Sequence, residues 1–377
     1  MAATALAAGC AEGNRERVKA IDLSYLDTTV SPAVDFYQYA TGGWQKNNPL
    51  KPEYARFGSF DYLNENNEKR INDLFKSMTE MKATKGSVEQ KISDIYKMGL
   101  DSLKLNEEGF TPVKKYLHQI LVAESKDELV KVIADLHDSG ESSFFGTFVM
   151  SDLMDSESQI LYIGQGGLGI GDRDYYTEAE NAEIKKGYEK FLTRVFELAG
   201  VPIPETAAAN ALAVEDVLAI NSWTSVQERD MEKLYNPMST EEIEAKYPGF
   251  DFKAYFAARN IPDQKKINVN EPSFFEAFSN YFAEADLNML KNYMAGQLIQ
   301  GACGALSDDF YDASFDFFNR QMSGVTEQKP RWKRAMSVPN SILGEAVGKM
   351  YVEKYFPQSS KKKMVELVAN LQTALGE

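Results

Sequence analysis

The chain has 377 residues, a 44% share of hydrophobic residues and a formal net charge of −15. That length and apolar content can bury a sizeable core and indicate two or three domain-sized units. The acidic balance argues against nucleic acid as a partner, because such binding rests on clustered Lys and Arg that neutralise phosphates.

No apolar segment reaches the roughly 18 residues that a membrane-spanning helix needs. Residues 1–10, MAATALAAGC, are rich in small residues and are similar to the end of a bacterial lipoprotein signal. In this interpretation Cys10 is lipidated, the protein is exported to the periplasm or anchored to the outer membrane, and this anchor is the only membrane contact. The usual basic segment and full apolar segment are missing, so the alternatives are an upstream start codon or an accidental likeness.

Helix start signals recur along the chain. Capping-box patterns, in which a hydroxyl and an acid or amide satisfy the first backbone N–H groups, begin at Ser87, Ser125, Thr177 and Ser239. Thr111-Pro112 adds a start with proline at the first helical position. These signals predict helices over 60–82, 88–104, 112–123, 126–138, 178–199 and 205–229.

Short runs of aromatic and β-branched residues at 143–150 and 159–163 predict one small β-hairpin. Residues 252–356 return to helix, and the aromatic residues between Phe274 and Phe282 are expected to be core. Met364, Val368, Leu371 and Leu375 lie on one helical face, which leads us to expect that it packs against further sequence beyond Glu377. Cys303 is expected to be a lone buried thiol.

The residues that usually carry catalysis are not arranged for it here. The two histidines, His118 and His137, lie 19 positions apart, so they do not form the His-Glu-x-x-His pattern of a zinc site, and structural roles are expected for both. Residues 164–169 match Gly-x-Gly-x-x-Gly, but a dinucleotide site needs a helix that begins at the glycines. Residues 170–176 intervene before the expected helix, so nucleotide binding is disfavoured.

Four segments, in order, resemble the neprilysin and endothelin-converting-enzyme family of zinc metallopeptidases. They are DFYQYATGGW at 35–44 with RFGSFD at 56–61, GLGIGDRDYY at 167–176, LYNPMS at 234–239, and RWKR at 331–334 with LGEAVGKMYVE at 343–353. The resemblance covers nearly the whole chain. It implies the N-terminal peptidase region of a bacterial member.

This resemblance implies a mainly α fold, a multi-helix lid-type domain with a small β-hairpin near 143–163. It divides the chain into a signal remnant and linker (1–20), a segment that packs on a thermolysin-like catalytic half (21–75), the helical lid (76–345) and helices that lead back to the catalytic half (346–377). The catalytic half, including the His-Glu-x-x-His motif, is expected beyond residue 377. The complete enzyme would use zinc and hydrolyse peptides, whereas this chain alone is expected to bind no zinc and to have no catalytic residues.

Arg56 matches the family arginine that binds the C-terminal carboxylate of the substrate. A planar guanidinium suits this role because it can meet a carboxylate through two hydrogen bonds. The family often has a second arginine where this chain has Asn64, which puts a strict preference for free C-termini in doubt. Gly42 and Gly43 are expected to end the first helix with left-handed backbone, Trp44 to be a packing anchor, and residues 172–174 to tie their turn to the following helix.

Two other functional classes remain as alternatives. The first is a non-catalytic helical protein of the bacterial cell envelope that binds peptides or proteins. The second is a nucleotide-dependent enzyme that uses the glycines at 164–169. The reading frame after Glu377 would separate the first alternative from the peptidase, and the position of the nearest helix N-terminus would test the second.

Overall fold

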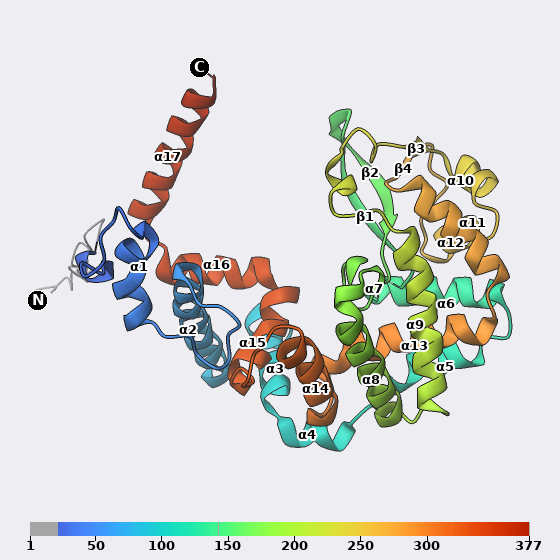
Figure 1. Ribbon diagram of the computed structural model, residues 1–377, viewed down its shortest axis with the longest axis horizontal. Coiled ribbons are helices and arrows are strands. Elements are labelled where there is room, and N and C mark those ends of the chain that lie inside the picture. Colours follow the sequence, from blue (N-terminus) through green and yellow to red (C-terminus); the bar gives the residue numbers. More distant parts are fainter. Residues whose placement is uncertain (1–21, 142, 377) are drawn as a thin grey trace, which may run out of the picture. The chain divides into compact units, whose positions relative to one another are not determined.

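The computed structural model describes residues 22–141 and 143–376, so Cys10 and its expected lipidation lie outside the described residues. The chain divides into two compact units, Met1–Asn66 and Asn67–Glu377. The fold is mainly helical with one small sheet, as the sequence predicts (Figure 1). None of the described helices is long and apolar enough to cross a membrane.

The first unit is built around helix α1 (Phe36–Asn47), which Asp35 caps by accepting a hydrogen bond from the Gln38 N–H at 2.9 Å. The prediction that Gly42 and Gly43 end this helix is wrong, because α1 continues through both glycines. The short 3-10 helix η1 (Leu23–Tyr25) lies against α1 at this point. A Cβ on Gly43 would overlap the Ser24 carbonyl oxygen, so the glycine permits close approach.

The second unit contains a large core and a small core. The large core takes its buried residues from sequence between Leu117 and Phe317. Its helices are α5 (Lys114–Val122), α6 (Lys126–Asp138), α7 (Asp174–Thr177), α8 (Ala182–Ala199), α9 (Pro204–Asn221), α10 (Thr240–Lys246), α11 (Phe252–Ala258), α12 (Pro272–Glu284), α13 (Leu287–Ala302), α14 (Asp308–Ser314) and the π-helical η5 (Phe315–Gln321). The 3-10 turns η2 (Ala179–Asn181), η3 (Gln227–Arg229) and η4 (Cys303–Ala305) connect them.

The small core joins helices from both ends of the second unit. It contains α2 (Ser59–Glu80), α3 (Val88–Leu100), α15 (Arg331–Ile342) and α16 (Gly344–Tyr355), while α4 (Ser102–Glu108) follows α3. α3 and α15 approach closely, because a Cβ on Gly99 would lie 2.9 Å from the Cα and Cβ atoms of Ala335. Arg331 Nε also donates to the Gly99 carbonyl at 2.9 Å. The last helix, α17 (Gln358–Gly376), leaves Met364, Val368, Leu371 and Leu375 exposed.

The predicted hairpin is longer than expected and belongs to a four-stranded sheet. β1 (Phe145–Asp152) pairs antiparallel with β2 (Asp155–Gln165), with Phe145 opposite Gln165 and Ser151 opposite Gln159. β4 (Ile267–Val269) adds to β2 in parallel, and β3 (Pro237–Met238) closes the order β1-β2-β4-β3. The outer part of the hairpin extends beyond the helices around α6 and α9 (Figure 1).

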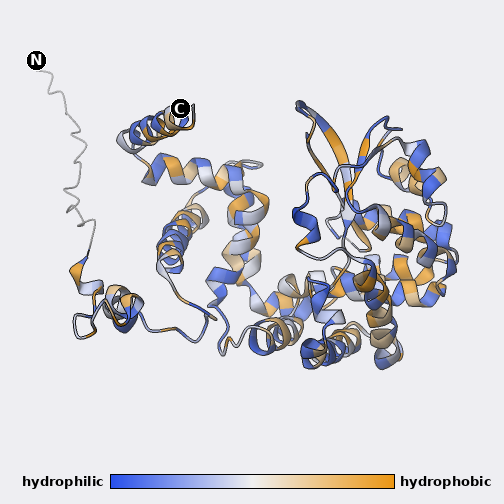
Figure 2. Ribbon diagram, turned by 45° about the horizontal axis from the view of Figure 1, so that its top comes forward, coloured by the Kyte–Doolittle hydropathy of each residue, from blue (hydrophilic) through white to orange (hydrophobic). Residues whose placement is uncertain are grey.

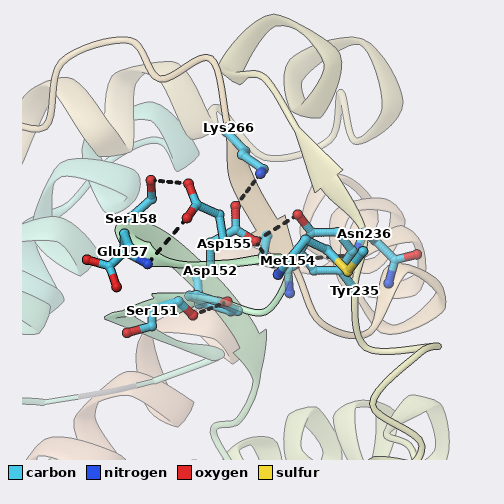
Figure 3. A network of polar contacts seen from close by, with 11 residues as sticks. Ser151, Asp152, Met154, Asp155, Glu157, Ser158, Tyr235, Asn236 and Lys266 are labelled. Carbon is cyan, nitrogen blue, oxygen red and sulfur yellow. Dashed lines mark hydrogen bonds and ion pairs between the residues drawn. The ribbon is translucent and has the colours of Figure 1, made fainter.

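A buried carboxylate anchors the outer end of this hairpin (Figure 3). Asp152 is 3% exposed, forms an ion pair with Lys266, and accepts from the Tyr235 hydroxyl at 2.8 Å. It also accepts from the Met154 N–H at 3.0 Å, which holds the turn. The Lys266 ammonium and these other donors lower the pKa of Asp152 to about 2. The turn is therefore fixed to the segments that flank β3 and β4.

Several predicted helix boundaries need correction. The helix over 88–104 is divided at Asp101, whose side chain caps α4, and the helix over 205–229 ends at Asn221. The helix expected at 112 begins at Lys114, without a side-chain cap. Thr177 does not cap the next helix, because it ends α7 and a 3-10 turn precedes α8. The capping box at Ser239 forms as predicted. At Ser87 and Ser125 the serine caps its helix, but Gln90 and Glu128 accept from the N–H of Gly86 and Glu124, each one residue before the cap.

Candidate functional site

Arg56 lies exposed on a loop of the first unit that aromatic side chains hold in place. The ring of its neighbour Phe57 stacks on Trp44, with ring centroids 6.2 Å apart, and packs edge-on against Tyr54, with centroids 5.2 Å apart. Lys51 Nζ lies 5.0 Å from the centre of the Phe57 ring, within cation–π range. Trp44 is thus a packing anchor, as predicted, and it fixes the residue next to Arg56.

Polar contacts hold the same loop from its other side. Glu65 is 7% exposed, binds Lys51 Nζ at 2.7 Å and accepts from the Tyr54 hydroxyl at 3.0 Å. Asp61 accepts from the Gly58 N–H at 2.8 Å, next to the start of α2. Arg56 therefore projects from a fixed backbone with its guanidinium exposed. Its predicted contact with a substrate carboxylate stays a prediction.

The backbone groups of the glycine-rich turn after β2 form hydrogen bonds with other parts of the protein. The Gly169 N–H donates to Glu215 Oε2 at 3.0 Å, and the Ile170 N–H donates to the Tyr176 hydroxyl oxygen at 3.1 Å. The Tyr293 hydroxyl donates to the Gly167 carbonyl at 2.8 Å. Since α7 begins only at Asp174, no helix N-terminus is formed by these glycines to receive a phosphate. The nucleotide interpretation is not supported.

Glu215, which no sequence pattern singles out, lies at the centre of this turn. Its carboxylate is 1% exposed and accepts hydrogen bonds from the hydroxyls of Tyr176 and Tyr188, the second at 2.9 Å. Gln297 Nε2 donates to it at 2.7 Å. Burial raises the pKa of Glu215 to about 7, although its four donors favour the ionised form. This carboxylate connects α7, α8, α9 and α13.

A polar cavity of about 360 Å³ lies beside the same turn. Asp172 accepts from the Ser225 hydroxyl at 2.7 Å, and Arg173 Nε donates to the Ala219 carbonyl at 3.2 Å. These residues therefore tie the turn to the end of α9 and the segment after it, rather than to the following helix as predicted. Only Asp174 serves that purpose, since its carbonyl accepts from Asn181 Nδ2 at 2.8 Å. On the far wall Glu228 accepts from Gln165 Nε2 at 2.9 Å.

His137 is a structural residue, as predicted. It is 9% exposed, and its ring nitrogens lie 2.6 Å from the Tyr255 hydroxyl and 2.9 Å from the Ser143 carbonyl. Burial lowers its pKa to about 4, so the imidazole is neutral at pH 7. His118 lies exposed on α5. Among the described residues no group of three or more His, Cys, Asp or Glu side chains could hold a metal ion, so these residues do not fit a zinc site.

Cys303 is also as predicted. Its side chain is 1% exposed, its thiol contacts the Ile299 carbonyl at 3.3 Å, and burial raises its pKa to about 12. The aromatic residues of α12 are core as well, with Phe274, Phe275, Phe278 and Phe282 all at most 2% exposed. Neither group provides a reactive centre.

A family model described as Peptidase family M13 matches residues 32–377. The chain belongs to peptidase family M13. Human endothelin-converting enzyme 1 is 27% identical over 371 residues, which are 94% of this chain and 48% of that protein. An endothelin-converting enzyme homolog of Locusta migratoria is 27% identical over 93% of this chain and 51% of its own length. The neprilysin-family resemblance is thus confirmed, and members of this family are zinc metalloendopeptidases.

Solved structures give the same result for the fold. The Mycobacterium tuberculosis zinc metalloprotease Zmp1, in complex with an inhibitor, superposes with a TM-score of 0.89 at 27% identity. The match covers 94% of this chain and 54% of Zmp1. PepO from Lactobacillus rhamnosis shares the fold, with a TM-score of 0.77 over 89% of this chain and 53% of PepO, at 18% identity. The M13 chain described here spans about half the length of these relatives.

Proposed function

We propose that this M13 chain is the N-terminal part of a neprilysin-like zinc metalloendopeptidase that hydrolyses peptides. In this proposal the chain encloses the substrate cavity and contributes substrate binding, and the zinc motif lies beyond residue 377. The observation that carries the proposal is the family match over 32–377 on a chain about half as long as its relatives.

The zinc-bearing part of the complete enzyme and the part described here would have different roles. In the complete enzyme zinc would polarise the scissile carbonyl and activate water, with a glutamate as general base. The part described here would bind and orient the peptide. We propose the domain limits 1–20, 21–75, 76–345 and 346–377 for the signal remnant, the segment on the catalytic half, the lid and the returning helices.

Arg56 is the proposed substrate contact. Its guanidinium is exposed, while Phe57 and the contacts of Glu65 fix the loop that carries it. The fixed loop places the Arg56 side chain at one exposed position, and its planar guanidinium can bind a carboxylate through a double hydrogen bond. Asn64, exposed on α2, has no positive charge to add to this contact. We therefore propose that Arg56 binds the C-terminal carboxylate without a second arginine, and that the enzyme has no strict preference for short peptides with a free C-terminus.

Two measurements test this function. Metal analysis and peptide cleavage should show neither stoichiometric zinc nor chelator-sensitive hydrolysis for the 377-residue chain, and both for the protein translated from the contiguous reading frame. A stop codon after Glu377, with no His-Glu-x-x-His downstream, would contradict the proposal and support the non-catalytic binding protein instead.

The role of Arg56 needs the catalytically competent protein. We expect Arg56→Ala to raise KM for a peptide with a free C-terminus by the equivalent of about 1.5–3 kcal/mol, the contribution of a hydrogen bond to a charged group. The C-terminally amidated peptide should be much less affected. Arg194→Ala, at an exposed position on α8, is the control. Equal relative losses on both peptides would exclude carboxylate recognition.

The proposed location is the bacterial envelope, with Cys10 as the lipidated residue. The support is the sequence MAATALAAGC, in which small residues precede the cysteine. Metabolic labelling with a palmitate analogue should mark the exported wild-type protein and not Cys10→Ser. Labelling of both proteins, or of neither, would count against an anchor at this position.

A further inference from the structure

β1 forms one edge of the sheet, since β2 is its only strand neighbour in the described structure. In an antiparallel pair, alternate residues direct their N–H and C=O groups away from the partner strand. Natural edge strands usually carry a lysine, a proline or an inward-pointing charge that prevents further pairing. Residues 145–151, FGTFVMS, contain none of these, and the one inward-pointing charge of β1 is Asp152, at its last position. The edge is thus chemically able to accept another extended strand.

Apolar side chains stand exposed on both faces of this edge. Phe148 and Met150 lie on one face and are 41% and 43% exposed, and Val149 lies on the other face and is 66% exposed. The Phe148 ring stacks on Tyr162 at 5.3 Å, so its orientation is set. Figure 2 shows hydrophobic residues along the strands of this hairpin. Exposed apolar side chains gathered in this way are typical of interaction surfaces.

The face of Val149 is also hollowed. A cavity of about 530 Å³ lies between this part of the hairpin and the loop before β4, and Val149, Leu161 and Ile261 contribute apolar walls. Gln264 and Lys265 line its other side. Val149 is the one residue of β1 that lines this recess, which extends from β1 over β2 toward the loop before β4.

Both ends of the exposed segment are fixed. At the inner end Arg259 Nη1 donates to the Thr147 hydroxyl, and Arg259 Nε binds Asp138 at 2.7 Å. At the outer end Asp152 is held by Lys266 and by Tyr235, as Figure 3 shows. The segment between these anchors is pre-organised as a strand, which lowers the entropy lost on binding.

The charge at the outer end indicates the chemistry of the occupant. Asp155 and Glu157 follow the turn directly, and Asp155 accepts hydrogen bonds from the Glu157 N–H at 3.3 Å and from the Ser158 hydroxyl at 2.6 Å (Figure 3). Their carboxylates favour a basic residue near the turn, and the net charge of −15 disfavours acidic partners.

We propose that the free edge of β1 binds an extended peptide segment with apolar side chains and an adjacent Lys or Arg, as an added strand. This inference rests on the proposed peptidase function and deepens it, because it assigns a second contact to the peptide substrate. Backbone hydrogen bonds to β1 supply affinity, and Phe148, Val149 and Met150 select apolar residues.

The test is direct binding to the 377-residue chain. The probe is a fluorescently labelled peptide of alternating valine and threonine that ends in lysines and a carboxamide, so that no C-terminal carboxylate contributes. Val149→Lys places a charge on the edge and should weaken binding at least about tenfold, whereas Val122→Lys, at a 52% exposed position on α5, should leave it unchanged. The same peptide N-methylated at alternate amides should not bind, because it cannot form the ladder.

Three outcomes would overturn the proposal. These are equal affinity of wild type and Val149→Lys, undiminished binding of the N-methylated peptide, or a wild-type dimer that Val149→Lys dissociates in sedimentation analysis. The last outcome would assign the edge to a second copy of the chain. Because the binding assay needs no zinc and no cleavage, failure of this proposal is distinguishable from failure of the proposed peptidase function.

Discussion

The substitution Gly169→Ala tests whether the glycine-rich turn is shaped by buried tyrosines. A Cβ at this position would overlap the Tyr188 hydroxyl oxygen, and it would lie 2.7 Å from Tyr188 Cζ and 3.0 Å from Gln300 Oε1. Tyr188 is fully buried and cannot swing into solvent. We therefore expect its ring to be displaced from the Glu215 carboxylate.

Two terms set the size of the effect. The displaced hydroxyl lies 2.9 Å from Glu215 Oε1 and 2.8 Å from Gln300 Oε1, and leaving a buried polar group without its partner costs about 1–3 kcal/mol. Forcing an extra methyl group into a packed site costs about 1–3 kcal/mol more. The free energy of unfolding should fall by about 2–6 kcal/mol. Gly301→Ala, in α13 with no atom within 4 Å of the new Cβ, should be neutral or stabilising by up to about 1 kcal/mol.

Urea denaturation measures the loss, and hydrogen exchange of residues 164–171 locates it. Tyr188→Phe removes the atom that collides first, so Gly169→Ala should cost less in that background than in wild type. If Gly169→Ala is as well tolerated as Gly301→Ala, or if Tyr188→Phe gives no relief, then the glycine is not required by the packing of Tyr188.

Three further predictions concern other parts of the chain. The folded-state pKa of His137, about 4, is below its ordinary value of 6.5, so the unfolded chain binds a proton first as the pH falls. The protein should therefore lose about 3 kcal/mol of its free energy of unfolding between pH 6.5 and 4 through His137. The difference in free energy of unfolding between wild type and His137→Gln should shrink over that window. Gly43→Ala should detach η1 from α1, because the Cβ would also lie 2.8 Å from the Leu26 carbonyl oxygen; limited proteolysis should cut near residues 24–27, and unchanged protection would contradict this. Asp152→Asn should speed hydrogen exchange at the turn after β1, whereas Asp135→Asn, at an exposed position on α6, should not. Equal exchange in both variants would refute the anchoring role of Asp152.

Sequence prediction succeeded where local signals determine structure. α6 forms at the predicted residues because Ser125 caps it and its apolar residues recur at helical spacing. The end of α9 was missed because its alanine-rich sequence continues without a glycine or proline, and the helix stops where Trp223 binds Gln165 through a 2.6 Å hydrogen bond. β3 and β4, with two and three residues, are defined by their partner strands and carry little signal of their own.

The candidate site was less predictable, because contacts between residues far apart in the sequence form it. Glu215 is bound by groups 27, 39, 46 and 82 positions away, and no local pattern distinguishes it among the 56 acidic residues of the chain. Arg56 was found only because the residues around it resemble a family motif, and the structure adds the aromatic packing that fixes its loop. The β1 edge was predicted as a hairpin strand, but its exposure depends on where the rest of the sheet forms.

The close approach of α3 and α15 has an evolutionary consequence. Gly99 and Arg331 are 232 positions apart and joined by a hydrogen bond, and nearby Asn106 Nδ2 donates to Asp308 at 3.0 Å. The segment that forms the large core therefore begins and ends at neighbouring positions of the small core, as an inserted domain does. Such an insert can be lengthened, replaced or transplanted without moving the helices that receive it.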